Sequence, residues 1–342
     1  MKKRNILGIL LLAYCLVCRF HAPSADFYAE KLYPCISGVL SFVAAIFPFS
    51  LEEIAVITFF VLILFLVVKG IRRRERSFVL AGKLITLVMW LGVWFYMGWG
   101  NNYYRTGLYE RNGIERAVYD EAVFRTFLSG FTAELNQAAT KTGAFDKESL
   151  ETDIKSYYTD VVRPFGYTGL HGWQHIKKPL FNRLYSAVSV SGFMGSFFCE
   201  SQVNEDVLDL EYPFVAAHEL AHLAGVTSEA EANWWAFDFC RNSPESAVCY
   251  SGYLSILPYV LQNAKMLLPS DDYNLWAASV SDKVKADYTA SVRHWKELRV
   301  GWIDRTQSWI YNLFLKWNGV SEGIHDYFGV VSVIMTMDAA AI

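Results

Sequence analysis

The residues best suited to chemistry in this 342-residue chain gather in residues 212–235, which read YPFVAAHELAHLAGVTSEAEANWW. The segment contains His218, Glu219 and His222 in the pattern H-E-x-x-H. On a helix, positions 218 and 222 project from one face, one turn apart, at a spacing that suits two ligands of one small cation. Two neutral imidazoles suit zinc, and a neighbouring glutamate that is not a ligand can take a proton from a zinc-activated water. The pattern therefore predicts a zinc site with Glu219 as the general base.

The flanking residues predict that this pattern lies on a buried helix. Pro213 suits the first helical turn, where its missing N–H costs nothing, and Gly225 is a natural residue to end the helix. The four residues before His218 are apolar, so the histidines are expected to point into a protein interior. Buried polar groups need partners, and a metal would satisfy both imidazoles and the carboxylate. The alternative is a pair of core histidines held only by hydrogen bonds.

A catalytic zinc ion needs a third protein ligand, and two glutamates follow the pattern closely. A helical hairpin that turns at Gly225 would bring Glu229 and Glu231 back towards the histidines. Glu231 is the first choice for the ligand. It could instead form a capping box with Ser228. Glu229 would then act on the helix dipole or be the ligand itself. A ligand distant in the sequence is the remaining alternative.

Residues 195–236 resemble the bacterial membrane family DUF3810, in which hydrophobic N-terminal segments precede HELAH, a glycine and an E-x-E-A-N stretch. The E-A-N element, residues 231–233, is similar to the third-ligand region of the ImmA/IrrE peptidases, which favours Glu231. The resemblance implies a zincin-like zinc metallopeptidase. One departure is Trp234-Trp235, where a phenylalanine and a smaller residue are expected, and this affects packing more than ligation. The resemblance implies no particular substrate.

The apolar residues are distributed unevenly along the chain. Hydrophobic residues make up 53% of the sequence and charged residues 19%, and most of the excess precedes residue 100. Three apolar runs, at about residues 6–20, 51–70 and 79–99, are expected to span a membrane. Residues 32–49 are interrupted by proline and glycine and are expected to be interfacial or re-entrant. Residues 1–102 therefore form the predicted transmembrane region, and residues 103–342 form the predicted zincin-like domain.

Basic residues predict the orientation in the membrane. They cluster at residues 1–4 and again at residues 69–76, and cytoplasmic loops collect lysine and arginine. Two crossings between these clusters keep both inside, and the run at 79–99 then crosses outwards. The domain is thus expected to be extracytoplasmic in a multi-pass protein of the cell membrane. A cleaved signal peptide is the alternative for the first run.

The rest of the chain predicts a mainly helical domain with a small β element. Residues 184–198 give the best strand signal because valine and serine alternate within them. Such a strand, just before the H-E-x-x-H helix, could hold an extended substrate or form a structural hairpin. Amphipathic helices are expected at residues 245–266, 271–299 and 303–318.

Taken together, the sequence predicts a membrane-anchored zinc metallopeptidase that hydrolyses peptide bonds in a peptide or protein substrate of the membrane or cell wall. The required oxyanion donor has three candidates, Tyr253, His171 and His175. A membrane sensor or scaffold that binds zinc without catalysis is the alternative function. The net charge of −3 and the absence of a basic stripe exclude nucleic acid as the expected partner. Cys240 and Cys249 could form a disulfide outside the cytoplasm or remain buried thiols.

Overall fold

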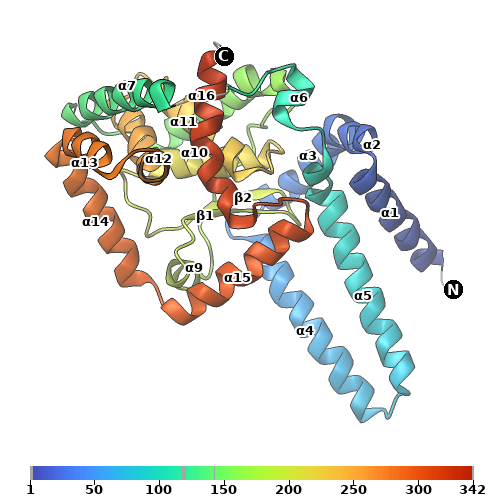
Figure 1. Cartoon of the computed structure of the whole chain (residues 1–342). Coiled ribbons are helices and arrows are strands. Elements are labelled where there is room, and N and C mark those ends of the chain that lie inside the picture. The colour runs from blue at the N-terminus through green and yellow to red at the C-terminus, as the bar shows by residue number, and fades with distance from the viewer. Residues whose placement is uncertain (1–2, 118–120, 142, 341–342) are drawn as a thin grey trace.

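A computed structural model describes residues 3–117, 121–141 and 143–340 (Figure 1). This part of the chain is mainly helical, and its strands form one two-stranded antiparallel sheet. The helical fold class and the small β element expected before the H-E-x-x-H helix are confirmed. Met1 and Lys2, which belong to the basic start used to predict the orientation, lie outside the described residues.

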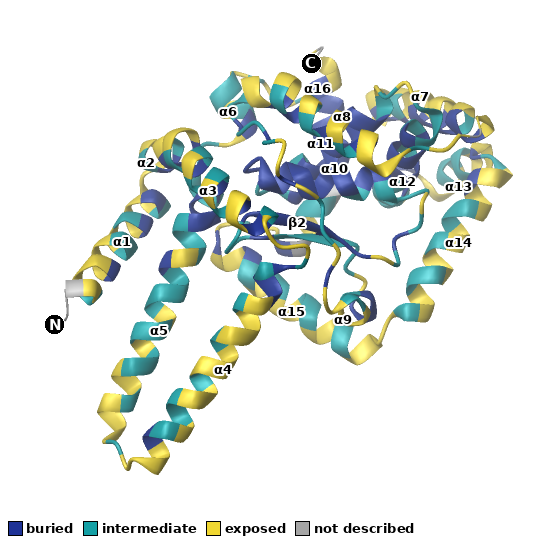
Figure 2. Ribbon diagram, turned by 180° about the vertical axis from the view of Figure 1, so that it is seen from behind, coloured by how far each residue is buried: buried dark blue, intermediate teal, exposed yellow. Residues whose placement is uncertain are grey.

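Two long apolar helices form a hairpin that protrudes from the rest of the molecule (Figure 1). They are α4 (Leu51–Arg72) and α5 (Ser77–Gly98), and their apolar stretches are almost uncovered by protein (Figure 2). Each has the length and composition needed to cross a bilayer. A third candidate is a broken one, in which α1 (Lys3–Phe20) meets the helical segment Ala22–Ala45 at an angle of 118°. The number of crossings and the side on which the domain lies stay predictions.

The segment expected to be interfacial or re-entrant contacts the domain directly. After α2 (Ala22–Phe27) and η1 (Tyr28–Leu32), it forms α3 (Tyr33–Ala45), whose 13 residues are too few to cross a bilayer alone. The Tyr33 hydroxyl donates a 2.6 Å hydrogen bond to the carbonyl oxygen of Leu223, at the end of the H-E-x-x-H helix. The N-terminal region is thereby attached to the interior of the domain.

The domain is built around two buried helices, α10 (Tyr212–Leu223) and α11 (Glu229–Arg241), which are dark blue throughout most of their length in Figure 2. Trp234 and Trp235 of α11 are fully buried and form the centre of the core. Cys240 and Cys249 are free thiols, so the disulfide considered above is not formed. The described elements after α5 are η2 (Gly100–Tyr104), α6 (Leu108–Asn112), α7 (Glu121–Thr140), α8 (Lys147–Tyr157), η3 (Tyr158–Val162), η4 (Arg163–Phe165), α9 (Asn182–Ala187), β1 (Gly192–Gly195), β2 (Glu200–Val203), α10 (Tyr212–Leu223), α11 (Glu229–Arg241), α12 (Ser246–Leu267), α13 (Ser270–Ser279), α14 (Asp282–Leu298), α15 (Gly301–Trp317), η5 (Gly323–Gly329) and α16 (Val330–Ala339).

Two predicted elements differ in the structure. The strand expected at residues 184–198 is confined to β1, and its first part forms α9. The buried hydroxyl of Ser186 lies 3.0 Å from the Asn182 carbonyl oxygen, so a helical turn satisfies it locally. The single helix expected at residues 271–299 is split into α13 and α14, because Ser281 caps a new helix by accepting a hydrogen bond from the Val284 N–H.

A buried polar junction fixes the hairpin to the sheet. Glu200, at the start of β2, accepts hydrogen bonds from the Ser50 hydroxyl at 3.0 Å and the Glu52 backbone N–H at 2.7 Å. The other carboxylate oxygen of Glu200 pairs with the buried ammonium group of Lys177 at 2.7 Å. The first turn of α4 is therefore held directly against the sheet that borders α10.

Candidate metal centre

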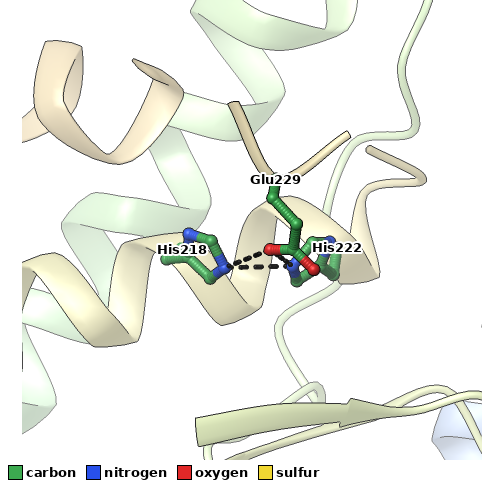
Figure 3. A group of neighbouring side chains, drawn as sticks. All are labelled: His218, His222 and Glu229. Carbon is green, nitrogen blue, oxygen red and sulfur yellow. Dashed lines mark hydrogen bonds and ion pairs between the residues drawn. The ribbon is translucent and has the colours of Figure 1, made fainter. Parts of the chain in front are cut away.

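The two histidines of the H-E-x-x-H pattern lie on one face of α10, as the spacing predicts (Figure 3). Their Nε2 atoms are 3.0 Å apart, and both side chains are buried. Nδ1 of His222 lies 2.8 Å from the carbonyl oxygen of Val226, which can only accept a hydrogen bond. Nδ1 must therefore carry the proton, and in the neutral ring Nε2 presents its lone pair to His218.

Glu229 completes the cluster from the first turn of α11. Its Oε2 atom lies 3.2 Å from Nε2 of His218 and 3.3 Å from Nε2 of His222 (Figure 3). The chain reverses between α10 and α11 at Gly225, whose φ of +97° is one that glycine readily adopts. The helical hairpin that the sequence predicted thus brings three potential ligand atoms together.

Glu231, the first choice from the sequence, does not lie with the histidines. Two residues after Glu229, its side chain is rotated by about 200° around the helix. Its carboxylate accepts a hydrogen bond from the Tyr167 hydroxyl, and it faces Arg105 and Arg111 on the wall of a different pocket. The predicted position of Glu231 beside the histidines is wrong, and Glu229, the second choice, occupies it.

Glu219 lies beside the cluster at the wall of a cavity of about 350 Å³. Its side chain is buried, and its Oε2 atom has no hydrogen-bond partner among the described residues. Burial raises the pKa of Glu219 to about 7, although the neighbouring histidines oppose the shift. The cavity is lined by Phe95, Trp99, Tyr103, Tyr185, Val190, Gly192, Phe193, Met194, Ser196, His218, Glu219, His222, Glu229, Gln307, Tyr311, Phe314 and Tyr327.

The protonation of the histidines and that of Glu229 depend on each other. Burial alone would lower the pKa of His222, but the carboxylate of Glu229 outweighs it and raises this pKa to about 9. Burial would raise the pKa of Glu229, but His222 and His218 hold it well below its usual range. Glu229 is therefore a carboxylate whose negative charge favours a positive charge, either a proton or a cation, between the two imidazoles.

The strand β1 runs past Glu219 at very close range. It pairs antiparallel with β2, with Gly192 opposite Val203 and Gly195 opposite Glu200. A Cβ atom at Gly192 would lie 2.7 Å from Cγ of Glu219 and 2.8 Å from its Oε1, so only glycine fits there. In the part of the chain that the structure describes, no second strand pairs with β1 along the edge away from β2.

Residues distant in sequence hold the cluster from outside. The Tyr311 hydroxyl of α15 donates a 2.6 Å hydrogen bond to Oε1 of Glu229. Asp326 of η5 accepts a 2.8 Å hydrogen bond from the Glu229 backbone N–H in the first turn of α11. The Trp99 indole, just after α5, donates a 2.9 Å hydrogen bond to the His222 carbonyl oxygen. Sequence reasoning missed these residues because no local pattern links them to the H-E-x-x-H segment.

The three oxyanion candidates from the sequence do not line this cavity. Tyr253 packs against Phe237 in the core, and His171 stacks on Trp173. His175 lies 3.0 Å from a carboxylate oxygen of Glu151. Tyrosines from α9, α15 and η5 line the cavity instead.

Comparison with known proteins adds one match. A family model described as "Protein of unknown function (DUF3810)" matches residues 28–335. No curated protein matches the chain, and no solved structure does so. Because the match extends from the segment before α3 into α16 and includes the whole candidate centre, the chain belongs to the DUF3810 family.

Proposed function

We propose that this protein is a membrane-anchored, zinc-dependent metallopeptidase. The observation that carries the proposal is the convergence of His218, His222 and Glu229 beside Glu219, at the wall of a cavity. Two imidazoles and one carboxylate are the ligand set of many catalytic zinc sites, in which a fourth position stays open for water or substrate.

The arrangement of His218, His222 and Glu229 suits a bound cation. Three buried atoms, each able to offer a lone pair, face one another within 3.3 Å. Without a cation, the cluster must keep a proton between the rings to avoid repulsion. The Oε2 atom of Glu219 accepts no hydrogen bond from the described residues, which is costly for a buried carboxylate. A divalent ion held by His218, His222 and Glu229 would remove the repulsion and place a positive charge beside both carboxylates.

The proposed chemistry divides between the ion and the chain. Zinc, when bound, would polarise the scissile carbonyl and lower the pKa of water. Glu219 takes a proton from the attacking water and delivers it to the leaving amine, a role that its pKa of about 7 favours. Burial also holds the pKa of Tyr327 well above its usual range, so its hydroxyl stays neutral. Tyr327 lines the cavity and is the proposed donor to the developing oxyanion.

The surroundings support a peptide as the substrate. The edge of β1 away from β2 offers backbone groups that can pair with an extended chain next to Glu219. Tyr311 and the Val226 carbonyl orient Glu229 and His222, as partners of zinc ligands usually do. We assign no sequence specificity to the site.

The proposal includes an extracytoplasmic domain. Four basic residues, Arg72, Arg73, Arg74 and Arg76, lie at the turn between α4 and α5, at the far tip of the hairpin from the domain (Figure 1). Cytoplasmic retention of this basic turn would leave the domain on the opposite side of the membrane. Peptides of the outer membrane face or of the cell wall are therefore the proposed substrate class.

The direct test is cleavage of a mixed peptide library by the purified full-length protein in detergent, followed by mass spectrometry. Wild type should cleave, and both Glu219→Gln and a strong chelator should abolish cleavage. Glu245→Gln is the matched control, because Glu245 precedes α12 and is absent from the cavity wall. Equal cleavage by wild type and Glu219→Gln would contradict the proposal.

A further inference from the structure

The helix α15 carries an exposed apolar face that no described element covers. Its exposed positions recur at helical spacing, so they form one stripe along the helix. Three tryptophans on this stripe are between 63% and 67% exposed. The apolar members are Trp302, Trp309, Ile310, Leu313 and Trp317. Arg305 and Lys316 are exposed on the same face, where the structure has no exposed acidic residue.

The N-terminal end of α15 lies beside α9, whose leading segment is hydrogen-bonded to the first turn of α4. The backbone N–H of Val300, just before α15, donates a 2.8 Å hydrogen bond to Ala187 at the end of α9. The segment that leads into α9 is tied to α4, because Glu53 accepts hydrogen bonds from the N–H groups of Leu180 at 2.6 Å and Phe181 at 3.0 Å. Both of those apolar side chains are exposed.

The C-terminal end of α15 lies at the end of α5 that meets the domain. The ring of Phe314 packs against Phe95 in the last turns of α5, with centroids 5.7 Å apart. The hydroxyl of Tyr96 donates a 3.1 Å hydrogen bond to the side chain of Asn318. The helix α15 therefore runs from the domain end of α5 towards α9 (Figure 1).

We infer that the exposed face of α15, together with Leu180, Phe181 and Leu184, rests on the lipid bilayer around the hairpin. The patch continues the exposed apolar surface of α4 and α5, for which a bilayer is the expected surrounding. Tryptophans with lysine and arginine are typical of helices that lie in the membrane interface. The inference rests on the membrane-spanning hairpin and is independent of peptide hydrolysis.

The placement connects the bilayer to the candidate metal centre. The opposite face of α15 contributes Gln307, Tyr311 and Phe314 to the cavity wall. The width of α15, about 10 Å, thus separates lipid from the hydroxyl of Tyr311, which holds Glu229. A substrate bond near the membrane surface would then lie at the height of the cavity.

The test measures the surroundings of α15 in the full-length protein in lipid nanodiscs. A nitroxide label is attached at Leu313→Cys or Trp309→Cys in a Cys35→Ser background, since Cys35 is an exposed thiol. Leu275→Cys on α13 is the matched control, because Leu275 is an exposed leucine outside the proposed patch. Collisions with oxygen, which concentrates in lipid, are compared with collisions with a water-soluble nickel chelate.

We expect labels at positions 313 and 309 to collide with oxygen and to be protected from the nickel chelate. The label at position 275 should remain accessible to the nickel chelate. Nickel access at 313 and 309 equal to that at 275 would show a water-exposed face and overturn the inference. Protection from both reagents would indicate a protein partner, such as a second copy of the chain, and would also overturn it.

Discussion

The hydroxyl of Tyr311 lies 2.6 Å from Oε1 of Glu229, while Oε2 of the same carboxylate faces the two histidines. A residue near the C-terminal end of the chain thus orients the side chain that completes the candidate metal centre. The arrangement makes α15 part of the site, although the H-E-x-x-H helix lies about 90 residues earlier in the sequence.

Removal of this hydroxyl should weaken metal binding without abolishing it. Tyr311→Phe keeps the ring but leaves Oε1 of Glu229 without its donor, so we expect zinc affinity to fall by about 10- to 100-fold. Competition with a fluorescent zinc chelator measures the change. Tyr250→Phe is the matched control, because it removes a 2.6 Å tyrosine–carboxylate bond to Asp287 outside the cavity. Equal zinc affinities for the two variants would contradict the role assigned to Tyr311.

Glu219 is predicted to act on the proton and not to hold the metal. Glu219→Gln should retain zinc and lose about 10²- to 10⁴-fold in turnover, because the amide cannot accept the proton of water. Metal analysis and peptide cleavage on one preparation separate the two effects. If wild type also binds zinc but shows no turnover, the result would favour the sensor or scaffold function instead.

The glycine on β1 should be required because of its contact with Glu219. In Gly192→Ala, the new methyl group would lie 2.7 to 2.8 Å from Glu219 atoms and 2.8 Å from the Gln202 carbonyl oxygen, so the carboxylate must shift relative to β1. We expect turnover to fall by about 10²-fold with the zinc content unchanged, since the ligands are on α10 and α11. Gly172→Ala is the control, because a Cβ atom there would meet no atom within 4 Å. Wild-type turnover in Gly192→Ala would show that the strand does not constrain Glu219.

The junction between hairpin and sheet should stabilise the fold. Lys177→Ala leaves the buried Glu200 carboxylate without its charged partner, and loss of a buried partner typically costs about 3–5 kcal/mol. Lys178→Ala, which breaks an exposed pair with Glu205, should cost about 1 kcal/mol or less. Thermal unfolding in one detergent compares the variants. Equal unfolding temperatures would show that the Lys177–Glu200 pair contributes nothing beyond a surface pair.

Local patterns in the sequence predicted the central helical hairpin well. The apolar context, Pro213 and Gly225 determined where α10 begins and ends, and the four-residue spacing placed His218 and His222 together. The long apolar runs likewise predicted α4 and α5, because their composition requires no knowledge of tertiary contacts.

The third ligand and the side chains around it could not be predicted from local sequence patterns. Glu229 and Glu231 lie only two residues apart, and the rotation of α11 relative to α10 decides which carboxylate faces the histidines. Asp326 bonds the first turn of α11 and Tyr167 bonds Glu231, and both of these contacts that hold the helix are long-range. The length of the predicted strand at residues 184–198 was overestimated for a similar reason. Its first part forms α9, which is held by polar contacts that the alternation of valine and serine does not reveal.

The most direct measurement is the metal content of the purified full-length protein and of two single variants, Glu229→Ala and Glu231→Ala, with circular dichroism to establish folding. We predict about one zinc ion per chain in wild type and in Glu231→Ala, and loss of zinc in Glu229→Ala. Zinc retained in a folded Glu229→Ala protein, or absent from folded wild type supplied with zinc, would contradict the proposed metal centre.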